Sequence, residues 1–345
     1  MRIGQRFAAA GAAVIMACGL GLAGCSGDGG DAADATAAVE AEEGAFPVTI
    51  EHVFGETTIE EAPTRIAAIG ESDVDPLLAL GITPVWVRGW TDEGPNEWQQ
   101  PLVDGDPLWF NHEEEMDFES IAAQNPDLII AQYADLEPDQ YEKLSDIAPV
   151  VAYAEETGGY QQSWQETTRI IGKAVGKPAA AEKLVTDLED RIAKVAEDHP
   201  NWAGKEAVVI VPDQEELIAY PEGDVSNRML HDFGFVYPDE VAALGDGTTN
   251  VFISMEQAGL VDHDMVVWEC WENCTLEGEG REAGALVISE HPILGNLEVV
   301  TGGRSFVTGD HIDDGMHYAL MWNTVLSIDH FLDTYVAVIE ETIGT

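Results

Sequence analysis

The chain has 345 residues, with 65 Asp and Glu against 15 Lys and Arg, so its formal net charge is −50 at pH 7. A chain of this length is typical of two domains rather than one. Such an acidic surface repels phosphate backbones and anionic lipids, which excludes nucleic-acid binding and electrostatic attachment to membranes. Because the acidic residues are spread through both halves, we interpret them as an adaptation to high salt; the alternative is an ordinary soluble acidic protein.

Residues 1–24 have the organisation of an export signal. Arg2 and Arg6 precede an apolar run at 7–20, which is too short for a stable transmembrane helix, and a Leu-Ala-Gly-Cys sequence ends at Cys25. This sequence resembles a lipobox, which implies cleavage before Cys25 and attachment of lipid, including palmitate, to the mature protein. A plain secretory signal with a chance cysteine is the alternative.

Residues 25–45 are rich in Gly, Ala, Asp and Glu and lack apolar periodicity. Self-repelling segments of this composition do not fold alone. We therefore expect a flexible acidic tether that holds the folded part near the membrane.

Strands and helices alternate from 46 to 158, which predicts an N-terminal α/β lobe with a mainly parallel sheet. Strands are expected at 48–54, 57–59, 65–69, 84–88, 127–131 and 150–153, and helices at 72–80, 117–124 and 140–147. The segment 89–117 is long, polar and aromatic, with Trp90, Trp98 and Trp109. A loop of this length in a compact lobe is usually functional.

Two linking helices are expected in 159–199, at 161–175 and 178–199. The second starts at Pro178, stops before Pro200, and carries an apolar stripe at helical spacing. At 1.5 Å per residue this helix is about 30 Å long, close to the width of a domain. We interpret it as a rigid helix that joins two lobes; the alternative is an ordinary surface helix.

Residues 200–345 repeat the α/β pattern and predict a C-terminal lobe. Strands are expected at 207–211, 217–220, 265–269 and 305–308, and helices at 226–233, 255–259, 282–289 and 317–340.

The loops at the carboxyl ends of these strands are rich in aromatic and cationic residues. In α/β lobes this is where ligands bind, and two such edges can face each other across a cleft. The candidate ligand-binding residues on these loops are Arg88, Trp90, Tyr133, Trp268, Trp271 and His311.

The sequence lacks the Gly-x-Ser-x-Gly, phosphate-loop and His-Glu-x-x-His motifs of common enzymes. His311 and His317 share a segment with three Asp residues, which fits either a metal site or a solvated acidic loop. Cys270 and Cys274 lack a nearby His. A disulfide between them is the favoured interpretation in an oxidising compartment, with a metal site as the alternative.

Several ordered motifs resemble class III periplasmic binding proteins, which serve ABC importers for ferric siderophores, haem and cobalamin. The resemblance covers about residues 46–340, and its most specific match is 118–130, Phe-Glu-Ser-Ile-Ala-Ala-Gln-Asn-Pro-Asp-Leu-Ile-Ile. Further matches lie at 62–66, 77–85, 143–150, 253–257, 264–267 and 297–307. The resemblance implies two α/β lobes joined by one long helix, and docking of Glu119 and Glu256 onto the permease.

The resemblance also implies an extracytoplasmic lipoprotein of iron transport that captures a ferric siderophore and delivers it to a permease and its ATPase. Further ligand contacts that the resemblance implies are Trp98 and Trp322, which match by loop position, and Arg228, which lies near but not at the position of the family's Arg. The scarcity of cations favours a neutral or cationic ferric hydroxamate over a catecholate. We expect a monomer that has no catalytic activity and needs no cofactor. The alternatives are haem, with Tyr133 or His311 as axial ligand, cobalamin, and a surface metal-dependent enzyme.

Overall fold

The computed structural model describes residues 40–89, 94–111, 115–155, 159, 162–213, 216–245, 250–269, 284–308, 320 and 322–344, with the side chains of 284–286 left aside. Its strands are β1 (Val48–His52), β2 (Gly55–Ile59), β3 (Ile66–Ala68), β4 (Trp86–Gly89), β5 (Leu108–Asn111), β6 (Leu128–Ala131), β7 (Val150–Ala152), β8 (Ala207–Pro212), β9 (Glu216–Ala219), β10 (Val251–Ser254), β11 (Met265–Trp268) and β12 (Ser305–Val307).

Its α-helices are α1 (Val74–Ala79), α2 (Phe118–Ala123), α3 (Pro138–Ser145), α4 (Trp164–Ala174), α5 (Pro178–Asp198), α6 (Val225–Asp232), α7 (Asp239–Ala242), α8 (Gly284–Glu290), α9 (Glu298–Thr301) and α11 (Val325–Ile343). Short 3₁₀ helices are η1 (Gln100–Leu102), η2 (Met255–Val261) and η4 (Leu294–Asn296). No helix in the described part of the chain is both long and apolar enough to cross a membrane.

The described strands form two five-stranded sheets and a small hairpin. The first sheet has the order β5-β4-β3-β6-β7, and all its neighbours are parallel. The second has the order β10-β9-β8-β11-β12, in which β8, β11 and β12 are parallel and β9 and β10 are antiparallel additions. The α/β class with mainly parallel sheets is therefore confirmed. The strands of each sheet fall inside 46–158 and 200–345, while the exact lobe boundaries remain a prediction.

Helices cover both faces of the first sheet because its short, buried strands are apolar on both sides. On one face Ile66, Leu128 and Ile130 pack with residues of α1, α4 and the start of α5. On the other face Ile129 and Trp86 pack with residues of α2 and α3. Trp86 on β4 is fully buried.

Helix α5 contributes to the cores of both sheets. Its Ala181 packs in the first core, whereas Val185, Leu188 and Ile192 pack in a core that includes Val209 and Val267 of the second sheet. The crossing with α4 is so close that a Cβ added at Gly172 would lie 2.2 Å from the Cβ of Ala181. The sequence-based prediction that one long helix joins the two α/β halves is therefore confirmed.

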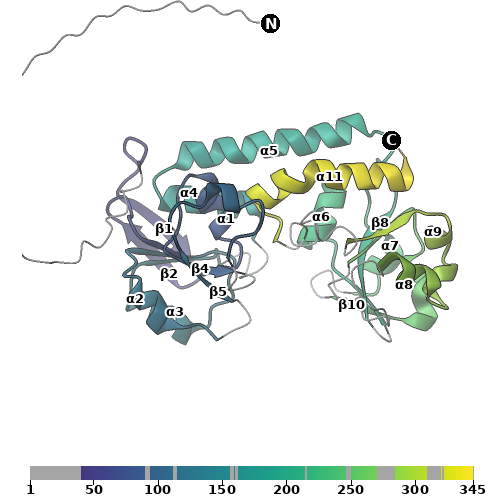
Figure 1. The fold of residues 1–345 in the computed structure, drawn as a ribbon, viewed down its shortest axis with the longest axis horizontal. Coiled ribbons are helices and arrows are strands. Elements are labelled where there is room, and N and C mark those ends of the chain that lie inside the picture. Colours follow the sequence, from purple (N-terminus) through teal and green to yellow (C-terminus); the bar gives the residue numbers. More distant parts are fainter. Residues whose placement is uncertain are drawn as a thin grey trace, which may run out of the picture. The chain divides into compact units, whose positions relative to one another are not determined.

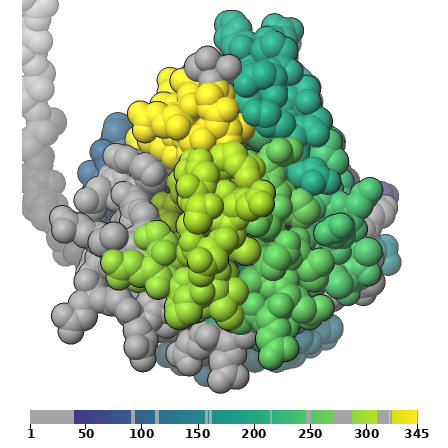
Figure 2. Space-filling model, turned by 90° about the vertical axis from the view of Figure 1, so that its right-hand side faces the viewer, coloured from purple at the N-terminus to yellow at the C-terminus, as the bar shows by residue number. Residues whose placement is uncertain are grey.

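Helix α11 runs beside α5 (Figure 1), and the guanidinium of Arg191 on α5 binds the carboxylates of Asp329 and Asp333 on α11. Figure 2 shows α11 and α5 next to each other at the surface, with the segment that holds α8 and α9 beneath α11. The buried side of α11 places Phe331 and Tyr335 in the core of the second sheet. The two helices thus form a layer over that sheet.

The helix expected at 255–259 is present as a 3₁₀ helix. Two other sequence-based expectations were wrong in detail. The segment 89–117 is not a loop throughout, because it contains β5 as an edge strand. The helix expected at 317–340 is interrupted, because Asn323 has a φ of 47° and Thr324 caps a new helix from Val325. Asn accepts this left-handed conformation more readily than most residues do.

Candidate functional site

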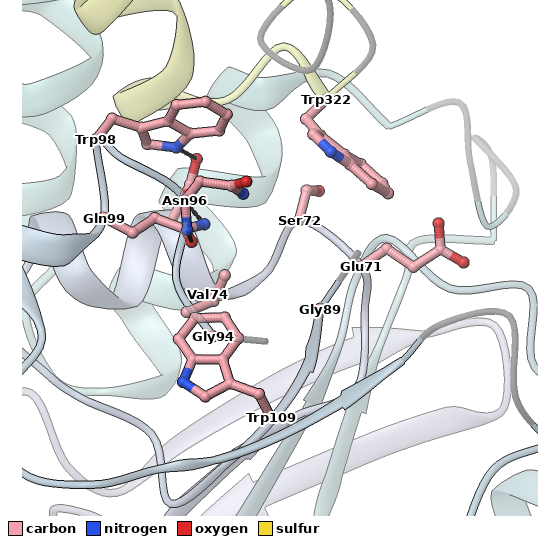
Figure 3. Close-up of a pocket in the computed structure, with 11 residues that line it drawn as sticks. Glu71, Ser72, Val74, Gly89, Gly94, Asn96, Trp98, Gln99, Trp109 and Trp322 are labelled. Atoms are coloured by element: carbon pink, nitrogen blue, oxygen red, sulfur yellow. Dashed lines mark hydrogen bonds between the residues drawn. The ribbon is translucent and has the colours of Figure 1, made fainter. Parts of the chain in front are cut away.

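A hollow lies at the carboxyl ends of the first sheet's strands, and it contains about 380 Å³ of empty space including its open mouth. Three tryptophans line it: Trp98 from the segment before η1, Trp109 from β5 and Trp322 from the segment before α11. Figure 3 shows the rings of Trp98 and Trp322 on one side and that of Trp109 on the other. Aromatic walls with a few polar groups are typical of small-molecule sites.

The polar groups of this hollow are carboxylates, amides and one hydroxyl. Glu71, Asp75, Asn96 and Gln99 line it, as does Ser72, which lies near Trp322 (Figure 3). No Lys or Arg is among the described residues that line it. The field in the hollow therefore favours neutral or cationic ligands over anionic ones.

A second hollow of about 290 Å³ adjoins the first, because Ser72 and Trp322 line both. Tyr133 and Gln162 form part of its wall, together with Trp164 of α4 and Val225 of α6. A bulky ligand would use both, with the ring of Trp322 between them.

The loop after β3 is held by the buried carboxylate of Asp73. It accepts hydrogen bonds from the backbone N–H groups of Gly70 at 3.1 Å, Gln132 at 2.8 Å and Tyr133 at 3.0 Å. Burial raises the pKa of Asp73 to about 6, and the three bonds oppose this shift. Position 70 requires glycine, because a Cβ there would lie 2.2 Å from an oxygen of Asp73.

A chain of buried amides supports the segment after β6. The Nε2 of Gln132 donates to the carbonyls of Val151 at 3.1 Å and Ala152 at 2.7 Å. The Nε2 of Gln162 donates to the Oε1 of Gln132 at 2.7 Å and to the hydroxyl of Thr167 at 3.1 Å. These bonds satisfy buried polar groups and fix the backbone that presents Tyr133 to the second hollow.

The structure brings some of the predicted ligand-binding residues together. Trp98 and Trp322 line the first hollow, and Tyr133 meets Trp322 at the second. Arg88 is half-buried on β4, one residue before Gly89 of the first hollow, and Arg228 is half-buried on α6, three residues after Val225 of the second. Trp90, Trp271, His311, Cys25, Cys270 and Cys274 lie outside the described residues.

Trp268 requires a correction, because its side chain is 0 % exposed. It packs with Val208, Ile210 and Ile288 in the core on one face of the second sheet and lines neither hollow. The sequence placed it at a strand end, but the alternation of β11 turns this side chain into the core. We therefore assign Trp268 to packing.

Glu119 and Glu256, the expected permease-docking residues, are both exposed. Glu119 lies in the first turn of α2, where Asp117 accepts hydrogen bonds from the N–H groups of Glu119 and Ser120 at 3.1 Å. Glu256 lies in the first turn of η2. Their exposure leaves both carboxylates accessible to a partner. Among the described residues, no group of three or more His, Cys, Asp or Glu could hold a metal ion.

Sequence reasoning did not select Glu71, Asp75, Gln99 or Trp109 as site residues. Asp75 and Gln99 are buried polar residues that become meaningful only through contacts with distant segments. Trp109 was noted as one of several aromatics in a supposed loop, whereas its position on β5 directs it into the hollow.

Comparison with known proteins identifies a family and relatives with a similar sequence. The family model described as periplasmic binding protein matches residues 66–311. A putative ABC transporter substrate-binding lipoprotein, YhfQ of Bacillus subtilis, is 26% identical over 82% of this chain and 84% of its own. A probable siderophore-binding lipoprotein of the same organism, YfiY, is 28% identical over 57% of this chain and 59% of its own.

Among solved structures, PiaA of Streptococcus pneumoniae in complex with ferrichrome has a TM-score of 0.70 and 25% identity, covering 86% of this chain and 98% of its own. The fold, together with the site at the carboxyl ends of the first sheet's strands, defines a class III periplasmic binding protein. Members of this class are substrate-binding transport proteins rather than enzymes. The chain belongs to the periplasmic binding protein family.

Proposed function

We propose that this protein captures a ferric siderophore outside the cytoplasm and delivers it to an ABC importer. The observation that carries the proposal is the double hollow, which combines tryptophan walls with carboxylates and amides. The names of similar proteins support it, since YfiY is described as siderophore-binding and PiaA was solved with ferrichrome. The siderophore itself supplies the ligands of iron, so the protein needs no resident cofactor.

The siderophore we favour is of the hydroxamate type. A ferric tris-catecholate is a trianion, and it would meet Glu71 and Asp75 without a Lys or Arg among the described lining residues. A neutral or cationic ferric hydroxamate avoids this repulsion and can pack against the indole rings. In this proposal the charge of the ferric complex, rather than its shape, is the first property that excludes catecholates from the site.

Cys25 serves as the lipid attachment point in this proposal, and residues 25–45 connect the binding unit to the outer face of the membrane. The mature protein works as a monomer, and Glu119 and Glu256 are its acidic contacts with the permease. The ATPase binds the permease on the cytoplasmic side of the membrane.

Calorimetric titration tests the ligand class. The probes are a neutral ferric trihydroxamate, a cationic ferric trihydroxamate with a free amine, and a ferric tris-catecholate. We expect both hydroxamates to bind at least about tenfold more tightly than the catecholate, because each tenfold corresponds to about 1.4 kcal/mol and charge repulsion readily exceeds that in a partly buried site. Tighter binding of the catecholate would refute the hydroxamate assignment.

Haem or cobalamin is the second candidate, because the hydroxyl-bearing ring of Tyr133 lies at the wall of the second hollow. A tyrosine oxygen can serve as an axial ligand of haem iron. A Soret band that survives gel filtration after incubation with haemin, and that is lost in Tyr133→Phe, would support haem over a siderophore.

A further inference from the structure

The carboxylate of Asp75 joins the wall of the first hollow to the start of α11. Asp75 lies on α1 and is 2 % exposed. It accepts hydrogen bonds from the indole Nε1 of Trp98 at 3.1 Å and from the Nε2 of Gln99 at 2.6 Å. The hydroxyl of Thr324 donates a third bond to the same carboxylate.

Thr324 is the residue that caps α11. Its Oγ1 accepts from the N–H of Ser327 at 3.0 Å, and the Oγ of Ser327 accepts from the N–H of Thr324 at 2.8 Å. The carboxylate of Asp75 therefore lies at the amino end of a 19-residue helix, where the helix dipole favours negative charge. Removal of the carboxylate affects this helix end as well as the hollow.

Neighbouring contacts tie the same two segments together. The ring of Trp98 approaches that of His330 on α11, with centroids 5.8 Å apart. Leu326 of α11 packs against Val74 and Leu78 of α1. The remainder of α11, including Phe331 and Tyr335, belongs to the core of the second sheet. The start of α11 thus contacts both halves, because Leu326 packs on α1 while Val325 and Ile328 belong to the core of the second sheet.

Asn323, next to Thr324, makes a hydrogen bond to the half of the protein that contains the second sheet. Its Nδ2 donates to the carbonyl of Val225, the first residue of α6, at 2.8 Å. The segment from Trp322 to Thr324 therefore contacts the first half through Asp75 and Tyr133, and the second half through α6. This segment therefore connects the two halves of the protein, in addition to the connection through α5.

We propose that Asp75 is a positioning residue that couples occupancy of the ligand pocket to the junction between the two halves of the protein. The proposal rests on the proposed function, because the pocket is taken to hold the ligand. A ligand that packs on Trp98 fixes its indole, which orders the carboxylate of Asp75. The ordered carboxylate then holds the Thr324 cap, so that binding stiffens the start of α11.

Amide hydrogen exchange of the ligand-free protein gives the first test. Asp75→Asn keeps the shape of the side chain but replaces one acceptor oxygen with a donor. We expect exchange to accelerate about tenfold or more both at residues 98–102 and at 325–329, since a buried donor that loses its acceptor carries the cost of its desolvation. Ser327→Ala is the matched control, because it weakens the helix cap but leaves the Asp75 carboxylate; it should affect 325–329 alone.

Ligand-dependent exchange gives the second test, with a ferric trihydroxamate as the probe. In the wild-type protein the ligand should slow exchange at both segments, whereas in Asp75→Asn protection should remain at 98–102 and disappear at 325–329. If Asp75→Asn does not fold, Thr324→Val takes its place, with Thr324→Ser as the variant that restores the hydroxyl and the coupling. If the ligand protects 325–329 equally in the wild-type protein and in Asp75→Asn or Thr324→Val, the proposal is overturned.

The two proposals fail in different ways. If no ferric chelate protects 98–102 in the wild-type protein, the proposed ligand is wrong. Even in that case, exchange in the ligand-free Asp75→Asn variant shows whether the carboxylate couples residues 98–102 to residues 325–329. Acceleration at only one segment in that variant overturns the coupling itself.

Discussion

The ring of Tyr133 meets the ring of Trp322 edge to face, with centroids 6.1 Å apart and an interplanar angle of 75°. Each ring is positioned by a different buried carboxylate. Asp73 holds the backbone N–H of Tyr133, and Asp75 holds the hydroxyl of Thr324, two residues after Trp322. Trp322 lines both hollows and Tyr133 lines the second, so both carboxylates contribute to the shape of one binding surface.

Trp322→Ala should weaken binding of the preferred ferric chelate by about tenfold or more, because a buried aromatic ring contributes both apolar area and ring contacts. Calorimetric titration measures the change. Trp202→Phe is the control, since Trp202 is fully buried against His199 and Phe235 away from either hollow and should leave the affinity unchanged. An unchanged affinity in Trp322→Ala would remove this ring from the site.

The double variant Glu119→Ala with Glu256→Ala should keep its ligand affinity and lose most of its ability to support uptake. Both carboxylates are exposed and line neither hollow, so their removal affects only docking. Uptake of radioactive ferric siderophore by cells that carry each variant is the measurement. Glu142→Ala with Glu290→Ala removes two other exposed carboxylates and should support normal uptake. Normal uptake by the first variant would contradict the docking role.

Glu269 should make the protein less stable as the pH rises. Burial raises the pKa of this carboxyl from 4.5 to about 8, with the charge of Asp224 as a smaller cause. Between these values the folded protein keeps a proton that the unfolded chain releases. This contribution to the free energy of unfolding is therefore complete below about pH 4.5 and falls as pH rises through 8, by at most about 1.4 kcal/mol per pH unit.

Urea unfolding at pH 5, 6.5 and 8 checks this behaviour. Glu269→Gln mimics the protonated acid and should flatten the decline, so that its advantage over the wild type grows with pH. Glu290→Gln removes an exposed carboxylate on α8 and should follow the wild type. A constant difference between Glu269→Gln and the wild type at all three pH values would show that Glu269 does not retain its proton in the folded state.

The melting temperature should rise by several degrees between dilute buffer and molar salt. The formal net charge of −50 creates self-repulsion that counterions screen, with a Debye length of about 3 Å at 1 M. Melting curves in sodium chloride and potassium chloride, compared at equal ionic strength, measure the effect. A melting temperature independent of salt would leave the acidic composition without this explanation.

The pattern of the sequence was sufficient for the two sheets and the joining helix. Helix α5 shows its apolar stripe and its proline boundaries within one continuous segment, so its existence and its length could be predicted locally. Edge strand β5 could not, because Leu108 is exposed and the rest of the strand is only partly buried, so the strand lacks a clear apolar alternation.

The site was less accessible to sequence reasoning for a physical reason. The roles of Asp75 and Thr324 depend on a contact between residues 249 positions apart. In a chain with 65 acidic residues no local feature distinguishes Asp75 from the others. Trp98 and Trp322 were selected by their loop positions in the family resemblance, whereas Trp268, selected by the same criterion, belongs to the core.

The 249-residue separation of Asp75 and Thr324 also has a consequence for biosynthesis. Chain growth on the ribosome is vectorial, so the first sheet can form long before Trp322 and Thr324 exist. A nascent chain that ends before them has neither the shared wall of the two hollows nor the cap of α11. Translation through this segment is therefore required before the growing polypeptide can acquire its ligand affinity.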